Sequence, residues 1–208
     1  MQIIPALRLA ALLCAHGVAF SFLAALALAS YQAFLQTRSV LALGLLVVNT
    51  LFLLLFMARR KALAVADAPA AWLLGFACVL LPLLLRPADA SPWAGLAGVG
   101  AGLQWLGAGL IVAALLSLRR SFGIVAAHRG IQTGGLYRWV RHPLYAAELL
   151  FLLGFALAHA SLWNAVIWAL VAGFQVLRAG LEERFLARDA AYRAYRLRCP
   201  RRFVPGLW

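Results

Sequence analysis

Uncharged stretches long enough to cross a lipid bilayer follow one another along the chain. A bilayer core of about 30 Å takes about 20 helical residues, and such stretches occupy residues 9–36, 39–58, 68–85, 93–118 and 149–177. The last stretch is long enough for one strongly tilted helix or for two short ones, and residues 159–164 are typical of a turn, which favours a hairpin. The pattern therefore predicts an all-α protein, a polytopic membrane helix bundle of about six transmembrane helices that ends in a helical hairpin.

Composition supports a membrane location for these helices. Hydrophobic residues make up 65% of the chain and charged residues only 12%, whereas soluble domains carry about 25% charged residues. Too little polar surface remains to coat a water-soluble globule. An integral membrane protein is expected, and disordered, collagen-like and disulfide-scaffold classes are excluded.

The net charge of +13 is distributed unevenly between the two predicted sides of the membrane. With six crossings, the N-terminus, the loops 59–69 and 119–142 and the C-terminal tail share one side, and of the 19 lysines and arginines only Arg38 and Arg86 lie on the other. Since basic residues concentrate on the cytoplasmic side, both termini are expected in the cytoplasm of a bacterial-type inner membrane. The basic face then meets anionic lipid, and no groove-reading motif supports a nucleic-acid partner.

Signal-peptide and metal-binding features are both weak. Arg8 precedes the first apolar stretch and residues 27–29 (Ala-Leu-Ala) are typical of a cleavage site, but the run is longer than the apolar core of a signal peptide, which favours a membrane anchor. Cys14, Cys78 and Cys199 lack metal-ligand spacing. Neither a metal site nor a disulfide framework is expected.

Two segments on the predicted cytoplasmic side are rich in polar and aromatic residues. In residues 119–145, three glycines at 130, 134 and 135 allow a folded loop, and Pro143 suits the first turn of a helix. Arg141 and His142 would then lie just before a helix N-terminus, where the backbone favours an anion. The second segment starts at Arg178, which shares a helix face with Glu182 one turn later.

Glu148 lies about one turn into the predicted fifth helix. An acid inside a membrane segment is a functional candidate by default, and its spacing of three residues from Tyr145 puts both on one helix face. Two interpretations stay open. Glu148 faces an active-site cavity, where it contacts substrate or orients Tyr145 or Arg141, or it is a structural partner of Arg141 or Arg138.

Four short motifs in a fixed order carry a resemblance to a known family. They read Gly-Leu-Tyr-Arg-Trp-Val-Arg-His-Pro-Leu-Tyr, Arg-Ala-Gly-Leu-Glu-Glu, Tyr-Arg-Ala-Tyr and Arg-Phe-Val-Pro, at residues 135–145, 178–183, 192–195 and 202–205. This order resembles the integral membrane methyltransferases of the isoprenylcysteine carboxyl methyltransferase and phospholipid methyltransferase group. The resemblance covers about 107–205, and it divides the chain into N-terminal membrane helices, 1–92, and a methyltransferase core with a cytoplasmic tail, 93–208.

The resemblance implies that S-adenosylmethionine binds at the cytoplasmic ends of the last helices, while a lipophilic or membrane-borne acceptor enters from the bilayer. Arg141 and Glu148 are the candidate catalytic residues. The positions that match cofactor contacts of the family are Arg129, Gly130, Ile131, Tyr137, His142, Pro143, Leu144, Tyr145, Arg178, Glu182 and Glu183. The phospholipid branch also implicates a Gly-x-Gly, which Gly107 and Gly109 can supply, although a helix-packing notch is the alternative.

The sequence departs from the family pattern in two places that concern substrate choice. Residues 187–190 (Ala-Arg-Asp-Ala) replace the usual Phe-Gly after the two glutamates, and Ala147 replaces a frequent glycine. We therefore expect a membrane methyltransferase that acts on a lipophilic small molecule or a lipid. The alternatives are a phospholipid amine N-methyltransferase and a non-catalytic transport or scaffold protein.

Overall fold

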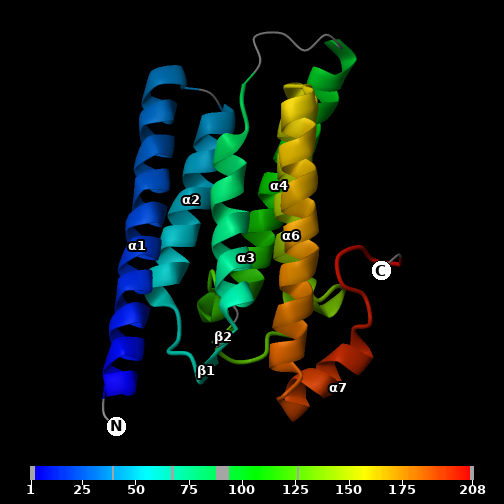
Figure 1. Cartoon of the computed structure of the whole chain (residues 1–208). Coiled ribbons are helices and arrows are strands. Elements are labelled where there is room, and N and C mark those ends of the chain that lie inside the picture. The colour runs from blue at the N-terminus through cyan, green and yellow to red at the C-terminus, as the bar shows by residue number, and fades with distance from the viewer. Residues whose placement is uncertain (1–2, 39, 67, 88–93, 126, 207–208) are drawn as a thin grey trace. The chain divides into compact units, whose positions relative to one another are not determined.

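The computed structural model describes residues 3–38, 40–66, 68–87, 94–125 and 127–206, and almost all of its regular structure is helical. The helices are α1 (Ile3–Thr37), α2 (Val40–Ala58), α3 (Pro69–Leu80), α4 (Ala94–Leu118), α5 (Pro143–Ala158), α6 (Leu162–Leu186) and α7 (Ala190–Arg198) (Figure 1). Short 3-10 turns are η1 (Leu81–Leu84), η2 (Arg119–Ser121) and η3 (Gly135–Arg138), and two-residue strands are β1 (Ala64–Val65) and β2 (Ala127–His128). The prediction of an all-α protein is confirmed.

Six of these helices are the apolar segments that the sequence predicts. Four, α1, α2, α4 and α6, are long and apolar enough to cross a membrane, and the segments Pro69–Leu84 and Pro143–Ala158 are apolar but shorter. The last apolar stretch forms a hairpin, because α5 ends at Ala158 and the Ser161 side chain caps α6 by accepting the N–H of Asn164. The predicted helix starts at 39 and 93, and most of the polar link 86–92, lie outside the described residues.

The chain divides into two compact units, Met1–Ala58 and Arg59–Trp208. In the first unit α1 packs on α2, and the Asn49 amide donates a 2.7 Å hydrogen bond to the Ser30 hydroxyl. The second unit contains α3 to α7 and all the residues that the sequence singles out for chemistry.

Small residues let α4 and α5 pack with their backbones close together. A Cβ atom added at Gly107 would lie 2.7 Å from the backbone N and Cα of Phe151, and one added at Gly154 would lie 2.6 Å from the carbonyl oxygen of Gly100. Gly109, on the exposed side of α4, would meet nothing within 4 Å. Gly107 therefore has a packing role in this fold, as small residues often have between membrane helices.

A buried asparagine joins the end of the α3 segment to the start of α6. Asn164 is fully buried, its amide donates to the carbonyl oxygens of Arg86 and His159, and its Oδ1 accepts the N–H of Arg86. The indole of Trp163 donates to the carbonyl of Leu84 at 2.7 Å. These bonds pair backbone N–H and C=O groups of residues 84–86, which follow the end of α3 and the 3-10 turn that contains Pro82.

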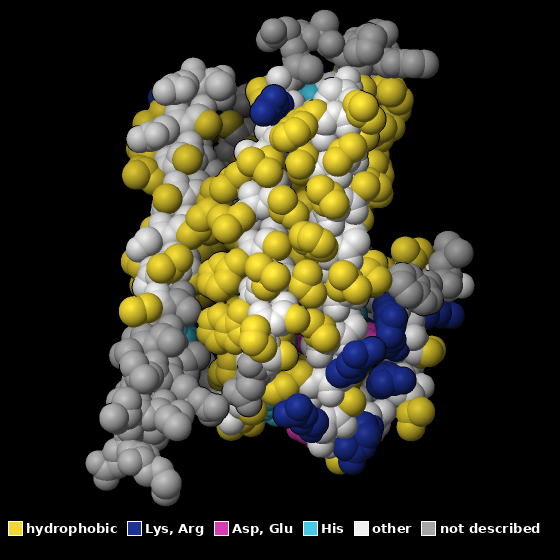
Figure 2. Space-filling model, viewed as in Figure 1, with side chains coloured by type: hydrophobic (Ala, Val, Ile, Leu, Met, Phe, Trp, Pro, Cys, Tyr) yellow, Lys and Arg dark blue, Asp and Glu magenta, His cyan; other side chains and the backbone are white. Residues whose placement is uncertain are grey.

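Polar structure gathers at the opposite end of the second unit. There β1 pairs with β2 in antiparallel register, and α7 turns away from the end of α6 (Figure 1). Figure 2 shows a face on which hydrophobic side chains cover the helices, whereas side chains of the lysine and arginine class gather at the end that carries α7. This division of surface chemistry is typical of a protein that meets lipid along its helices and water at their ends.

Candidate functional site

The Arg141-His142-Pro143 element lies at the start of α5, as the sequence predicts. Pro143 occupies the first turn, where its missing N–H costs nothing, and His142 is the N-cap residue. The backbone N–H groups of Arg141 and His142 donate to the carbonyl oxygens of Arg201 and Arg202, at 2.9 and 2.8 Å. The segment after α7, residues 199–206 and here called the C-terminal segment, is thus hydrogen-bonded to Arg141 and His142.

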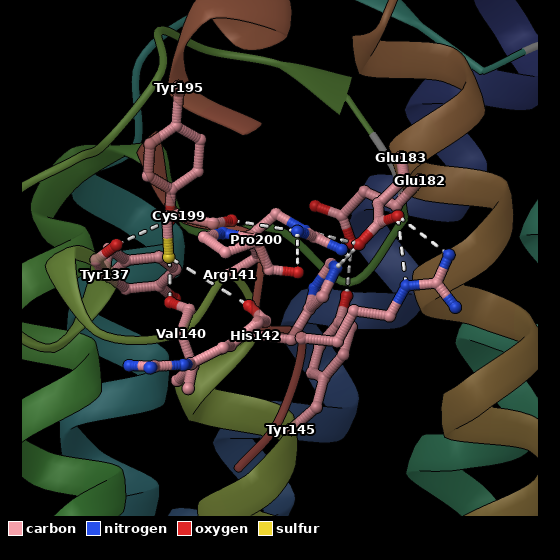
Figure 3. A network of polar contacts seen from close by, with 12 residues as sticks. Tyr137, Val140, Arg141, His142, Tyr145, Glu182, Glu183, Tyr195, Cys199 and Pro200 are labelled. Carbon is pink, nitrogen blue, oxygen red and sulfur yellow. Dashed lines mark hydrogen bonds and ion pairs between the residues drawn. The ribbon is translucent and has the colours of Figure 1, made fainter. Parts of the chain in front are cut away.

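Glu183 connects α6, the start of α5 and the C-terminal segment. Its Oε1 accepts from Arg141 Nε at 2.8 Å and contacts His142 Nε2 at 3.1 Å, and its Oε2 accepts from Arg202 Nε at 3.2 Å (Figure 3). Arg141 also donates to the carbonyl oxygens of Cys199 and Pro200. Because both carboxylate oxygens of this 3% exposed side chain are engaged, Glu183 holds the surrounding segments together.

Glu182 has a different environment from its neighbour. The hydroxyl of Tyr145 donates to Glu182 Oε2 at 2.6 Å. The Tyr145 ring stacks on His142 with centroids 5.3 Å apart, and the Arg178 guanidinium lies 4.6 Å from the centre of the same ring. Tyr145 therefore connects the N-terminus of α5 to the end of α6.

Helix α7 packs against the loop that precedes α5. The Tyr195 hydroxyl donates to the carbonyl oxygen of Tyr137 at 2.6 Å, and Tyr192, Tyr195 and Cys199 form a buried cluster against Ile131. The loop itself depends on Gly135, which has a φ of +60°. A Cβ there would clash with the Ser117 hydroxyl, so this turn requires glycine.

A small cavity of about 70 Å³ lies among these elements. Its lining brings together the loop 129–134 between β2 and η3, here called the glycine loop, with η3, the start of α5, the end of α6 and α7. The lining residues are Leu118, Ser121, Ala127, Gly130, Ile131, Gln132, Tyr137, Arg141, His142, Glu182, Leu186, Tyr192 and Tyr195.

The site residues predicted from sequence fall into three groups according to their distance from the cavity. Six line the cavity, namely Gly130, Ile131, Tyr137, Arg141, His142 and Glu182. A second group lies one step away: Arg129 and Pro143 adjoin lining residues in the chain, and Tyr145 and Glu183 bond to them. Leu144 follows Pro143 in α5, and Arg178 contacts the ring of Tyr145. The remaining three, Gly107, Gly109 and Glu148, do not line it, and Glu148 bonds to Gln175 rather than to Arg141 or Arg138.

Several lining residues were not assigned a role from the sequence. Tyr192 and Tyr195 had a signal, because two tyrosines three residues apart share one face of a short helix. Ser121 and Gln132 had none. They meet through a 3.0 Å hydrogen bond from the Gln132 amide to the Ser121 hydroxyl, which depends on how the loop folds.

Three buried polar atoms have no hydrogen-bond partner among the described residues: Tyr192 Oη, in a residue that lines the cavity, and Arg129 Nε and His128 Nδ1, in residues that precede the lining Gly130 or follow the lining Ala127. Buried polar groups are nearly always paired, so such atoms indicate a place for a ligand's polar groups or water. Burial raises the pKa of Tyr192 and of Tyr137 above the usual range, so both phenols keep their protons and can donate. Burial also lowers the pKa of the Arg129 guanidinium.

The comparison with known families agrees with this geometry. The family model described as phospholipid methyltransferase matches residues 96–193, which include most of α4, the glycine loop, the Arg-His-Pro element and both glutamates. No curated protein matches the chain. The predicted membership of a membrane methyltransferase family is confirmed, and the apolar helices make the chain an integral membrane protein. Residues 96–193, which supply most of the cavity lining, thus match the phospholipid methyltransferase family model.

Proposed function

We propose that the protein transfers a methyl group from S-adenosylmethionine to a lipophilic or membrane-borne acceptor. The observation that carries this proposal is the cavity at the polar end of the second unit, inside the segment that matches the family. The cavity combines the Glu182 carboxylate with the Tyr192 hydroxyl, which has no hydrogen-bond partner among the residues that the structure describes. The cavity adjoins the ends of apolar helices. A water-soluble cofactor and an acceptor from the bilayer can therefore meet there.

The residues around the cavity fit the chemical groups of this cofactor. Its amino acid end needs a cation and an acceptor, its ribose hydroxyls need acceptors, and its adenine needs an apolar or aromatic slot. Arg129 supplies a buried cation, Glu182 supplies a carboxylate, and Tyr192 supplies a phenolic donor. Ile131 and Leu186 supply apolar lining.

The size of the cavity implies that its walls move when a ligand binds. A volume of about 70 Å³ is well below the roughly 300 Å³ at which small-molecule sites begin. Glycines with positive φ at 130 and 135 give the loop a backbone that other residues rarely adopt. We therefore expect the loop and α7 to separate when the cofactor enters.

Positioning and exclusion of water supply most of the catalysis in this proposal. The bound cofactor supplies an electrophilic methyl group on sulfur. The chain holds both reactants in line and keeps water out, which accounts for a large part of the rate enhancement in displacement reactions. Arg141 and His142 are held by Glu183, so Glu182 is the lining carboxylate that can hold a cationic acceptor or take its proton.

A phospholipid amine is the second candidate acceptor. The matched family is described as phospholipid methyltransferase, and a protonated amine must lose its proton before it can accept a methyl group. Glu182 suits that step. A carboxylate or thiolate acceptor, in contrast, would depend on Glu182 only for cofactor binding.

Binding of S-adenosylhomocysteine to the protein in lipid nanodiscs, measured by calorimetry, tests the proposal. We expect saturable binding to the parent, at least a tenfold loss of affinity in Glu182→Gln, and no change in Arg184→Gln, an exposed charge in the same turn of α6. The parent would then be assayed with labelled methyl donor against amine, carboxylate and thiol lipids. No binding to a folded parent would contradict the proposal and favour a transport or scaffold role.

A further inference from the structure

The apolar helix α5 contains one acidic residue, Glu148. Glu148 does not line the cavity, and its Oε2 accepts a 2.7 Å hydrogen bond from the side-chain amide of Gln175. Charged groups within membrane segments are costly and persist where they pair with other groups or serve a function. Glu148 pairs with Gln175, so the contacts of Gln175 determine what Glu148 can influence.

The hydrogen bond from Gln175 fixes which way its amide points. Gln175 is 1% exposed, and because its nitrogen donates to Glu148, its oxygen is directed to Arg178, 3.5 Å from Nη1. If the amide rotated, it would present N–H groups to the guanidinium, which has only donors. Glu148 thus keeps an acceptor facing Arg178.

Arg178 is held from two further sides. Its Nη2 donates to the carbonyl oxygen of Ile124, and its guanidinium carbon lies 4.6 Å from the centre of the Tyr145 ring. A guanidinium over an aromatic face is attracted to it, more strongly where water is excluded, and Arg178 is only 7% exposed. A shift of Arg178 would therefore remove a support of the Tyr145 ring.

Tyr145 completes the connection to the cavity. Its hydroxyl donates to Glu182 Oε2 at 2.6 Å, and Glu182 lines the cavity. The contacts thus run without a gap from Glu148 through Gln175, Arg178 and Tyr145 to Glu182. Two of these residues belong to α5 and three to α6, so the chain of contacts links the two helices of the hairpin from within.

We propose that Glu148 and Gln175 are positioning residues, which hold Arg178 and, through Tyr145, set the direction of the Glu182 carboxylate in the cavity. This inference rests on the proposed function for its effect on cofactor affinity. It assigns Glu148 no contact with substrate. It also gives Gln175 a role that neither its residue type nor its place in an apolar helix indicates.

A double-mutant cycle tests the proposal, with S-adenosylhomocysteine affinity in nanodiscs as the readout. Glu148→Ala and Gln175→Leu are each expected to lower affinity about tenfold, whereas Glu148→Gln keeps an acceptor for the Gln175 amide and stays within about threefold. Leu150→Ala, a half-buried α5 residue, is the control. In a Glu182→Gln background, Glu148→Ala should add little further loss, because residues acting through one another are not additive.

Two outcomes of the cycle would overturn the proposal. One is the same loss from Glu148→Ala with and without Glu182→Gln, which would indicate a general effect on folding. The other is Glu148→Gln binding the cofactor like the parent but losing turnover, which would indicate direct contact with the acceptor.

Hydrogen exchange of the ligand-free protein separates this proposal from the proposed function. Glu148→Ala and Gln175→Leu should raise the exchange of residues 178–186 and 143–147, whereas Glu148→Gln and Leu150→Ala should not. If the parent does not bind the cofactor but the variants show this exchange pattern, the proposed function is rejected and the positioning role is retained. Unchanged exchange in Glu148→Ala would reject the positioning role even if the parent binds the cofactor.

Discussion

Tyr192 is the residue whose local chemistry most directly indicates a ligand. Its ring is buried in the cluster with Tyr195 and Cys199, while its hydroxyl has no partner among the described residues. Tyr195, one turn later, is equally buried, and its hydroxyl is bonded to the Tyr137 carbonyl. The two tyrosines are therefore a matched pair in which one hydroxyl supports the fold and the other is available to a ligand.

Tyr192→Phe should weaken S-adenosylhomocysteine binding without destabilising the protein. One hydrogen bond to a ligand contributes about 0.5–1.5 kcal/mol, so calorimetry should show a loss of about threefold to tenfold. Tyr195→Phe should instead lower the free energy of unfolding by about 1 kcal/mol, because it removes a bond that exists in the free protein. Equal affinity in parent and Tyr192→Phe would show that this hydroxyl does not meet the cofactor.

Residue identity alone did not separate the two adjacent glutamates. Both match the family motif, yet Glu183 has both oxygens occupied by Arg141, His142 and Arg202, while Glu182 lines the cavity. The difference arises because successive helix positions point about 100° apart. One therefore faces the C-terminal segment and the other the cavity.

At the scale of elements, the α4–α5 contact is set by glycines rather than by large side chains. Close backbone approach at Gly100, Gly107 and Gly154 leaves no room for a Cβ atom. The same Gly107 had a second interpretation from sequence as part of a cofactor-binding Gly-x-Gly. Substitutions at 107 and 109 distinguish a role in helix packing, which would change stability, from a role in cofactor binding, which would change affinity.

Gly107→Ala should destabilise the protein by about 1–3 kcal/mol, because an added methyl group would force α4 and α5 apart. Gly109→Ala, where nothing lies within 4 Å, should be neutral or stabilising by up to about 1 kcal/mol, since alanine is the better helix former. Thermal unfolding in detergent measures both. If Gly109→Ala lowered cofactor affinity at unchanged stability, the Gly-x-Gly would have a binding role.

Asp189 is the N-cap residue of α7, and its carboxylate accepts the N–H of Ala191 at 2.7 Å. The N–H of Ala191 and, next, the side chain of His128 hold the pKa of Asp189 below its usual value. A carboxyl with a lowered folded-state pKa adds stability that is present above its unfolded pKa, about 3.9, and is lost as the pH falls through the folded value.

Asp189→Ala should therefore lower the Tm relative to the parent at pH 7, and the difference should shrink as the pH falls below about 4. Asp189→Asn should lie between the two at pH 7, because asparagine retains the N-cap and loses the charge. A Tm difference that stays constant from pH 7 to pH 3 would assign the effect to something other than this carboxylate.

At the scale of the whole molecule, the charge distribution predicts which side of the membrane carries the cavity. The distribution of lysine and arginine predicts that the α5–α6 turn and the C-terminal segment lie on opposite sides, with the latter in the cytoplasm. Leu162, at the turn, is 83% exposed, and Arg201 is also exposed. Both positions are suitable for labelling.

A membrane-impermeant maleimide should label Leu162→Cys in intact cells and Arg201→Cys only after permeabilisation. Cys14 is exposed and would be replaced by serine, whereas Cys78 and Cys199 are buried and can stay. The reverse pattern would invert the predicted orientation. Labelling of both positions from one side would mean that the short helix α5 and its partner α6 do not cross the membrane as a hairpin.

The sequence by itself determined the helical class, the order of the apolar helices, the α5–α6 hairpin and the start of α5 at Pro143. These features follow from the length of apolar runs, from turn residues and from caps, all of which act between residues close in the chain. The motif order also identified the family of the segment that carries the cavity.

Only the tertiary structure decided which side chains meet. Arg141 and Glu183 are 42 residues apart, and Glu148 and Gln175 are 27 apart. The Tyr192 hydroxyl, which has no partner within the described part of the chain, is buried where α7 packs against Ile131 of the glycine loop. Such pairings depend on the angle and rotation with which helices pack. Local periodicity fixes the face on which a residue lies, but it does not specify the neighbour that this face will contact.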